Sequence, residues 1–274
     1  MAKNKKSGCI NTLITVVFVL VLLGVGVYVA FSKISYFSGS NLFEVYGIYS
    51  DLSVAVDEGD LVTNPTTESD YTSAVTILEN AGLTIFNQYD EVDPLLISSN
   101  YTLSTPFSLT DNEVAGFMNS IVADFSNLEA LGFNVNSIDG FALEILETTI
   151  EEVSTDVFNL DIVIKINIES LKESFGMFGF LLPNEVYLTS SSAIELVGGN
   201  YEVTSSTLKV NNLSAEDNDS LLTLIVDILN DGEDTYTAAS LQQTVGETLL
   251  DGLNLLSEHF NLSYSLSDGM ITFN

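Results

Sequence analysis

Near its amino terminus the chain carries an uncharged, strongly apolar run, and this run restricts the architecture of everything else. Residues 10–31 read INTLITVVFVLVLLGVGVYVAF and contain no Asp, Glu, Lys or Arg. At a helical rise of about 1.5 Å per residue the run extends about 33 Å, enough to cross a hydrocarbon core of about 30 Å. It therefore predicts one transmembrane helix in the plasma membrane, and the remaining chain must fold outside the bilayer.

Lysines on either side of the run predict its orientation. Three precede it and one follows closely: Lys3, Lys5, Lys6 and Lys33. The positive-inside rule makes residues 1–9 a basic cytoplasmic tail and puts the rest on the extracytoplasmic side. A cleaved signal peptide is the rival interpretation, but its apolar region is usually about 7–15 residues long and ends in a small-x-small site. Tyr28 stands where a small residue is required, so an uncleaved single-pass anchor is favoured.

The charge of the chain is divided between a basic head and an acidic body. Residues 1–33 hold four of the seven lysines and no acid, whereas residues 34–274 hold three lysines and all 38 acids, so their formal charges are +4 and −35. Nucleic acid is excluded as a partner, because phosphate neutralisation needs clustered Lys or Arg. The body also lacks cysteine, so a packed core must stabilise it without disulfides.

Residues 32–40 read as a juxtamembrane linker, and residues 41–274 carry the patterns of an extracytoplasmic acidic domain. Alternating apolar and polar residues predict strands over 95–107, 141–152, 158–168, 186–197 and 201–211. Apolar residues at helical spacing predict helices over 68–81, 110–125, 214–229 and 241–260. Residues 42–56 fit a helix or a strand.

Local signals refine this interpretation. Thr110 and Glu113 form a capping box at a helix start. The alternation changes phase near Ser205, which predicts a β-bulge. Asp268-Gly269 predicts a final hairpin with these facing pairs: Leu266 with Ile271 and Tyr264 with Phe273.

These elements predict an α+β fold in one domain. Strands and helices do not alternate regularly, so a doubly wound parallel sheet is not expected. We expect a mainly antiparallel, curved sheet of six to eight strands with about three amphipathic helices packed on it. Inward strand positions are expected to be almost purely Ile, Leu, Val and Phe, with the acids on loops, caps and outward positions.

The residue types needed for common catalytic sites are missing, so we do not expect an enzyme. His259, near the end of a Leu-rich helix, is the one histidine, and Cys9 lies on the cytoplasmic side of the anchor. Ser206 and Lys209 match the Ser-x-x-Lys spacing of serine-lysine acylases, but on a strand they point to opposite faces. No catalytic residue is assigned.

Neither a metal nor another cofactor is expected. Acidic clusters occur at residues 57–60, 217–219 and 231–234, but none has the ligand spacing of a helix-loop-helix calcium site. Four Asn-x-Ser/Thr sequons are weak signals that matter only if the cell glycosylates exported asparagines: Asn100, Asn212, Asn218 and Asn261.

The segments PFSLTDNEVAGFMNSIV (106–122) and LLPNEVYL (181–188), after a single N-terminal anchor, carry a resemblance to a family. In this arrangement the chain resembles the YpmS-like family of bacterial membrane-anchored proteins of uncertain function. The resemblance covers about residues 100–211 and implies a helix start of the Leu-Thr-x-x-Glu type before a long curved sheet. It explains neither residues 42–92 nor the last two helices, and it transfers no functional residue.

Two functions remain open. The first is a membrane-anchored binding module that holds a lipid or other apolar ligand between the curved sheet and the helices. Its expected lining is Phe117, Met118, Ile121, Phe158, Ile162, Ile164 and Leu188. The alternative is a non-enzymatic envelope, adhesion or scaffold protein, in which the same side chains form a solid core and the acidic surface meets an envelope protein partner.

Overall fold

The computed structural model describes residues 50–52, 54, 56–82, 105–122, 142–167, 169, 183–230, 237–260 and 262–274. Its helices are η2 (Glu58–Asp60), α3 (Glu68–Asn80), α4 (Asp111–Val122), α6 (Ala215–Asn230) and α7 (Ala238–Phe260). Its strands are β1 (Phe107–Thr110), β2 (Ala142–Ser154), β3 (Val157–Asn167), β4 (Glu185–Val197), β5 (Asn200–Val210), β6 (Tyr264–Ser267) and β7 (Met270–Phe273). The α+β class is confirmed.

Several expectations fall on other parts of the chain. The apolar run at 10–31, the linker at 32–40 and most of the strand expected over 95–107 lie outside the described residues. None of the helices in the described part is long and apolar enough to cross a membrane.

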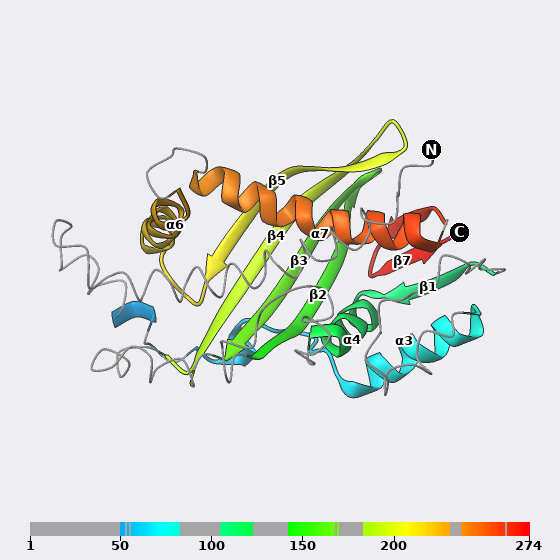
Figure 1. Cartoon of the computed structure of the whole chain (residues 1–274), viewed down its shortest axis with the longest axis horizontal. Coiled ribbons are helices and arrows are strands. Elements are labelled where there is room, and N and C mark those ends of the chain that lie inside the picture. The colour runs from blue at the N-terminus through cyan, green and yellow to red at the C-terminus, as the bar shows by residue number, and fades with distance from the viewer. Residues whose placement is uncertain are drawn as a thin grey trace, which may run out of the picture.

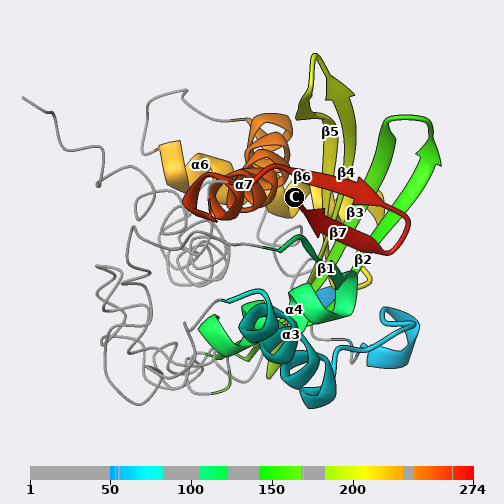
Figure 2. The same cartoon turned by 90° about the vertical axis from the view of Figure 1, so that its right-hand side faces the viewer.

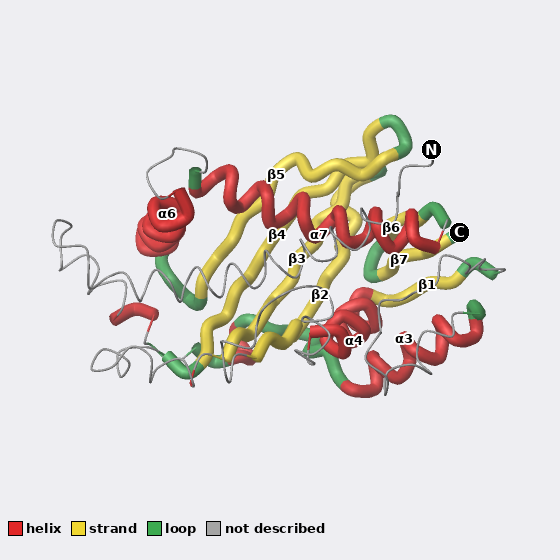
Figure 3. The backbone as a smooth tube through the Cα atoms, in the orientation of Figure 1, coloured by secondary structure: helices red, strands yellow, loops and turns green. Residues whose placement is uncertain are grey.

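The strands form two antiparallel sheets (Figures 1 and 3). Four long strands follow one another along the chain in the order β2-β3-β4-β5, and three short strands form a second sheet in the order β1-β7-β6. The expected single sheet of six to eight strands is therefore divided into two among the strands that the structure describes. Alternation shows which side of a strand is buried, but it does not show that Phe107 pairs with Phe273, far along the chain.

The tip of the last hairpin joins the two sheets. The Gly269 N–H donates to the carbonyl of Ile150 on β2 at 2.7 Å, and the Asp111 N–H donates to the carbonyl of Gly269 at 3.2 Å. Gly269 has φ of 66°, a left-handed conformation that suits glycine. The expected pairs of this hairpin, Leu266 with Ile271 and Tyr264 with Phe273, are both confirmed.

Two of the three register shifts in the long sheet set which of its residues face inward. Between Ile145 and Glu147 the register of β2 shifts, which explains why its alternation is irregular in the sequence. The second shift lies opposite Ala193 and Ile194, where β5 gains a residue between Val203 and Ser205. This is the bulge that the phase change in the sequence predicts.

Helices α3, α4, α6 and α7 and the small sheet lie on one side of the four-stranded sheet (Figure 2). On this inner side the main core cluster contains the inward apolar residues of all four strands and buried residues of α3, α4, α6, α7 and the small sheet. A second, smaller cluster on the outer side contains Val62, Leu146, Val163 and Tyr187, and the partly buried Val56 and Leu61 pack against it. Residues 56–66 therefore cover part of the outer face.

Side chains at the helix starts satisfy free backbone groups. The Thr110 N–H donates to Glu113 Oε2 at 2.8 Å, and the Glu113 N–H donates to Thr110 Oγ1 at 3.3 Å, which confirms the capping box of α4. The Asp217 N–H likewise donates to Ser214 Oγ at 3.2 Å before α6.

Each outer edge of the long sheet receives an asparagine from a helix. At the β2 edge, the Asn119 amide accepts from Ile145 N–H at 2.6 Å and donates to the Ile145 carbonyl at 2.7 Å. At the β5 edge, Asn218 accepts from Val210 N–H at 2.9 Å and donates to the Leu208 carbonyl at 2.8 Å. Each amide thus pairs a backbone N–H and a carbonyl at the sheet edge that could otherwise bind another strand.

Candidate functional site

The candidate site is the inner face of the four-stranded sheet. In β3, every second side chain points into the main core: Phe158, Leu160, Ile162, Ile164 and Ile166. Their exposed fractions range from 1% to 9%. β-Branched and aromatic residues at a spacing of two favour this strand geometry and give it one continuous apolar side.

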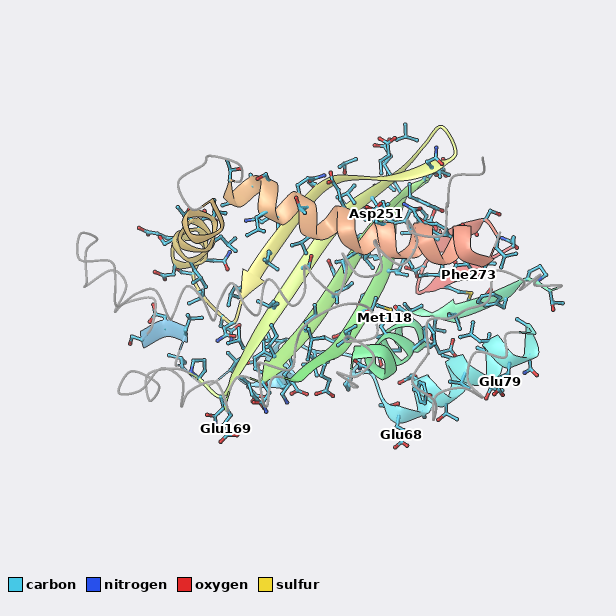
Figure 4. All side chains as sticks on the ribbon, viewed as in Figure 1. Glu68, Glu79, Met118, Glu169, Asp251 and Phe273 are labelled. Atoms are coloured by element: carbon cyan, nitrogen blue, oxygen red, sulfur yellow. The ribbon has the colours of Figure 1, made fainter. Side chains whose placement is uncertain are left out.

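The structure brings together six of the seven residues expected to line an apolar site. Phe158, Ile162, Ile164 and Leu188 are buried members of the main core cluster. Phe117 and Met118 of α4 are partly buried and pack against the same cluster; Figure 4 labels Met118 on α4. The side chain of Ile121 is not among those that the structure describes.

The described helices that contact this face lie mainly over its two edge strands. α4 packs on β2, whereas α7 packs on β5 and less extensively on β4. In Figure 1, α7 crosses the upper part of the sheet and α4 lies beside its lower right. The inner side chains of β3 consequently form an apolar strip between the two helices.

Polar side chains interrupt this apolar face at its centre. Thr148 on β2 faces Ile162 on β3, which faces Ser190 on β4, which faces Leu208 on β5. Thr148 is 5% exposed and Ser190 is 2% exposed, and the bulge in β2 is what turns Thr148 inward. No described residue supplies a hydrogen-bond partner for Ser190 Oγ. The expectation of almost purely apolar inward positions is therefore wrong on β2 and β4.

Two residues beyond Ser190 along β4, a pair of serine hydroxyls lies directly beneath α7. Ser192 and Ser206 face each other on β4 and β5, and their hydroxyl oxygens are 3.0 Å apart. A Cβ on Gly246 of α7 would lie 2.6 Å from Ser192 Oγ and 2.8 Å from the Ser206 Cβ. Glycine at this position allows the helix to approach the sheet closely, so this pair is satisfied and enclosed.

Aromatic rings occupy the end of the inner face nearest the small sheet. They form a series of neighbouring rings: Phe158, Tyr201, Tyr264, Phe273 and Phe107. Tyr201 and Tyr264 stack with centroids 5.2 Å apart, and Tyr201 Oη accepts from Leu266 N–H at 2.8 Å. Burial raises the pKa of the Tyr264 hydroxyl, which donates to Asn254 Oδ1 at 2.9 Å. The rings therefore link both sheets and α7.

The described lysines lie away from the inner face. Lys165 and Lys209 occupy outward positions of β3 and β5. Lys165 Nζ is 3.3 Å from both Glu58 Oε2 and Glu185 Oε1. Burial lowers the pKa of Lys165, but the hydrogen bonds to Glu185 and Glu58 and the electrostatic interactions with Tyr187 and Glu185 raise it by more, so the net shift is upward.

The neighbouring Tyr187 belongs to the same outer network. Its hydroxyl donates to Glu185 Oε2 at 3.0 Å. Burial, with this hydrogen bond and the carboxylate charge, raises the pKa of Tyr187 to about 12. The hydroxyl therefore remains protonated, and a donor, at neutral pH.

Among the described acidic side chains, Glu147 alone is buried. It is 7% exposed, and its two carboxylate oxygens accept hydrogen bonds from Thr63 N–H, Thr63 Oγ1 and Asn64 N–H at 2.8, 2.8 and 3.1 Å. The other described acids are half-buried or exposed, and Glu68 and Glu79 on α3 are exposed examples (Figure 4). Glu147 therefore attaches residues 56–66 to the outer face.

Replacing Glu147 by glutamine is expected to loosen residues 56–66 while the rest of the domain stays folded. The change removes charge-assisted hydrogen bonds and turns an amide donor toward backbone donors, at a cost of about 1.5–3 kcal/mol. Hydrogen exchange should show faster exchange at the Thr63 and Asn64 amides. Glu151→Gln is the control, because Glu151 is an exposed acid on the outer face of the same strand. Equal exchange in both variants would contradict the anchoring role of Glu147.

The groups considered for catalysis do not form a site in the described structure. Ser206 points to the inner face and bonds to Ser192, whereas Lys209 is exposed on the outer face. The side chain of His259 lies outside the described set. Among the residues that the structure describes, no group of three His, Cys, Asp or Glu side chains is placed to hold a metal ion.

Sequence reasoning missed the polar centre of the inner face. On β4 the even positions 188–194 read Leu, Ser, Ser and Ile, so two serines stand within a buried alternation. That pattern was a readable signal for Ser190. Thr148 carried no such signal, because its inward direction depends on the β2 bulge.

The resemblance to the YpmS-like family stays a prediction. The chain matches no protein-family model, and neither curated proteins nor solved structures show significant similarity to it.

Proposed function

We propose that this protein is a membrane-anchored extracytoplasmic module that binds an apolar ligand, such as a lipid, against the inner face of its four-stranded sheet. The observation that carries the proposal is the apolar strip of β3 between α4 and α7. Helices α4 and α7 contact mainly the edge strands β2 and β5. The inner strand β3 presents a long row of Ile, Leu and Phe side chains. An elongated hydrocarbon chain suits such a strip in length and chemistry.

The rest of the chain is consistent with such a role. Residues 10–31 would hold the module at a membrane, which supplies lipid at high local concentration. The acidic surface of the body would keep it from adhering to anionic headgroups, because like charges repel. A ligand would then pass between membrane and module without the body lying flat on the bilayer.

The second candidate is a scaffold or envelope protein with a solid core and an acidic surface for a protein partner. The observation that favours it is the near-complete burial of Ile164 and Leu188, at 2% and 1% exposure. Close-packed interiors normally bury such residues without any ligand.

The test begins with the full chain extracted from membranes in detergent. Native mass spectrometry and analysis of organic extracts should detect a lipid that remains bound after exhaustive washing. A protein that carries no lipid, and takes up none when lipid is offered, would overturn the binding function in favour of the scaffold.

A substitution at Ile162 distinguishes the two candidates further. Ile162 lies at the centre of the strip and is 9% exposed. If the strip holds a ligand, Ile162→Trp fills the ligand's place, so the variant folds and retains less lipid. In a solid core the same change overpacks the interior and lowers stability by about 1–3 kcal/mol. Asp161→Trp, on the outer face of the same strand, is the control.

A further inference from the structure

The hydroxyl of Ser190 is a buried polar group without a partner in the described structure. The residue is 2% exposed and its Oγ makes no hydrogen bond to any described atom. Two other described atoms share this condition, Thr66 Oγ1 and Asn112 Oδ1, but neither residue is on the four-stranded sheet. Burial of a hydroxyl without a new partner disfavours folding, so a polar atom is expected beside Ser190 in the working protein.

Ser192 shows that an unpartnered hydroxyl is not a general feature of this strand. It points to the same inner face two residues further along β4. Its hydroxyl lies 3.0 Å from that of Ser206, and Gly246 allows α7 to cover the pair. The sheet therefore provides a hydrogen-bond partner for Ser192, whereas the hydroxyl of Ser190 has none among the described residues.

The residues around Ser190 restrict the kind of ligand that could supply a polar atom to its hydroxyl. Its cross-strand neighbours on the inner face are Ile162 and Leu208, both buried in the main core. Thr148 is the nearest inward polar residue on the same row, two strands away, or about 10 Å at the usual strand spacing. A ligand that reaches Ser190 therefore contacts hydrocarbon on both sides, and most of its length is apolar.

The charges of the described residues restrict whether the polar group of the ligand can be ionised. Both described lysines occupy outward strand positions, and Lys165 is already bound to Glu58 and Glu185. A carboxylate or phosphate beside Ser190 would be buried without a described cation to balance it, within a body whose formal charge is −35. An uncharged oxygen has no such requirement.

We propose that the ligand is a neutral lipid with a long hydrocarbon chain, whose hydroxyl or ester oxygen forms a hydrogen bond with Ser190. This inference rests on the proposed binding function and adds the chemical class of the ligand. Ser190 selects the position of the polar oxygen, and the β3 strip binds the hydrocarbon.

Three probes of equal chain length test the inference: oleyl alcohol, oleate and octadecene. The full chain in detergent is incubated with each, repurified, and the retained probe is measured by gas chromatography. Oleyl alcohol should be retained about fivefold better than octadecene, as one buried hydrogen bond allows, and better than oleate. Ser190→Ala should remove the preference for the alcohol over octadecene. Ser191→Ala, on the outer face of the same strand, should leave it unchanged.

Ser190→Ala also has a readout without ligand. Because it removes an unpartnered buried hydroxyl, the delipidated variant should unfold at the same temperature as the wild type or higher. A clearly lower unfolding temperature would show that the hydroxyl has a partner within the chain, and would overturn the inference.

The outcomes separate this inference from the proposed function. Equal retention of all three probes, or strongest retention of oleate, would overturn the neutral-lipid inference and leave the binding function standing. Retention of no probe, together with the absence of co-purified lipid, would overturn the binding function itself.

Discussion

Gly116→Ala is expected to lower the stability of the domain by about 2 kcal/mol, within the range for overpacking a tight interface. A Cβ on Gly116 of α4 would lie 2.7 Å from Tyr71 N and 3.1 Å from the Asp70 carbonyl carbon, both backbone atoms of α3. The backbone of a helix cannot rotate away as a side chain can. α3 and α4 would therefore have to separate, which disturbs the buried Ala74 and Ala115.

The sign of the stability change in Gly116→Ala distinguishes the steric clash with α3 from the helix propensity of alanine. Alanine favours an isolated helix by about 1 kcal/mol over glycine, so local propensity alone predicts a more stable protein. Thermal unfolding of the full chain should instead show a fall of roughly 4–8 °C. The control is Gly59→Ala, where the added Cβ meets only Asp57 Oδ1 at 3.4 Å. A higher unfolding temperature for Gly116→Ala would mean that the two helices do not approach this closely.

Asn218→Ala is expected to destabilise the β5 edge by about 2–4 kcal/mol, because it removes the partner of two backbone groups at once. Asn218 is 7% exposed, and its amide pairs Val210 N–H and the Leu208 carbonyl. Alanine leaves both groups without that partner in a poorly hydrated place. Hydrogen exchange should show lost protection at the Val210 amide, and urea unfolding should show a lower midpoint.

Asn212→Ala is the matched control, since Asn212 is also an asparagine in a sequon but is exposed. It should leave both measurements unchanged. Asn218→Asp should fall between the two, because the carboxylate still accepts from Val210 N–H but no longer donates to Leu208. Equal stability of Asn218→Ala and Asn212→Ala would contradict the role of Asn218 at the sheet edge.

The same geometry bears on the sequons. A glycan on Asn218 would occupy the amide that pairs the β5 edge, so the folded domain has no room for it. Asn212 is exposed, and the pairing of the β5 edge does not involve its amide. These two sequons, alike in sequence, can therefore be distinguished only once the fold is known.

Local signals in the sequence predicted most of the described elements. Alternation placed β3, β4 and β5 to within about two residues of their observed ends. The capping box of Thr110 and Glu113 marked the start of α4, and Asp268-Gly269 gave the right register for the last hairpin. Each of these signals acts over a few residues, so it can be read without knowing the fold.

The candidate site was predictable only in part. The apolar lining followed from periodicity, since most inward positions on a strand or helix are apolar whichever element covers them. Thr148 was missed because a bulge between Ile145 and Glu147 reverses the direction of the residues beyond it. The missing partner of Ser190 was also invisible, because it depends on what surrounds the hydroxyl in space.

By itself the sequence determined the class of the fold, the approximate ends of β3, β4 and β5, and the buried side of β3 and of the last hairpin. Tertiary structure alone decided the division into two sheets, the close approaches at Gly116 and Gly246, and the burial of Glu147 beneath residues 56–66. The physical reason is the range of the interactions. Hydrophobic alternation and capping are local, whereas the pairing of Phe107 with Phe273 and of Glu147 with Thr63 depends on which distant segments exclude water together.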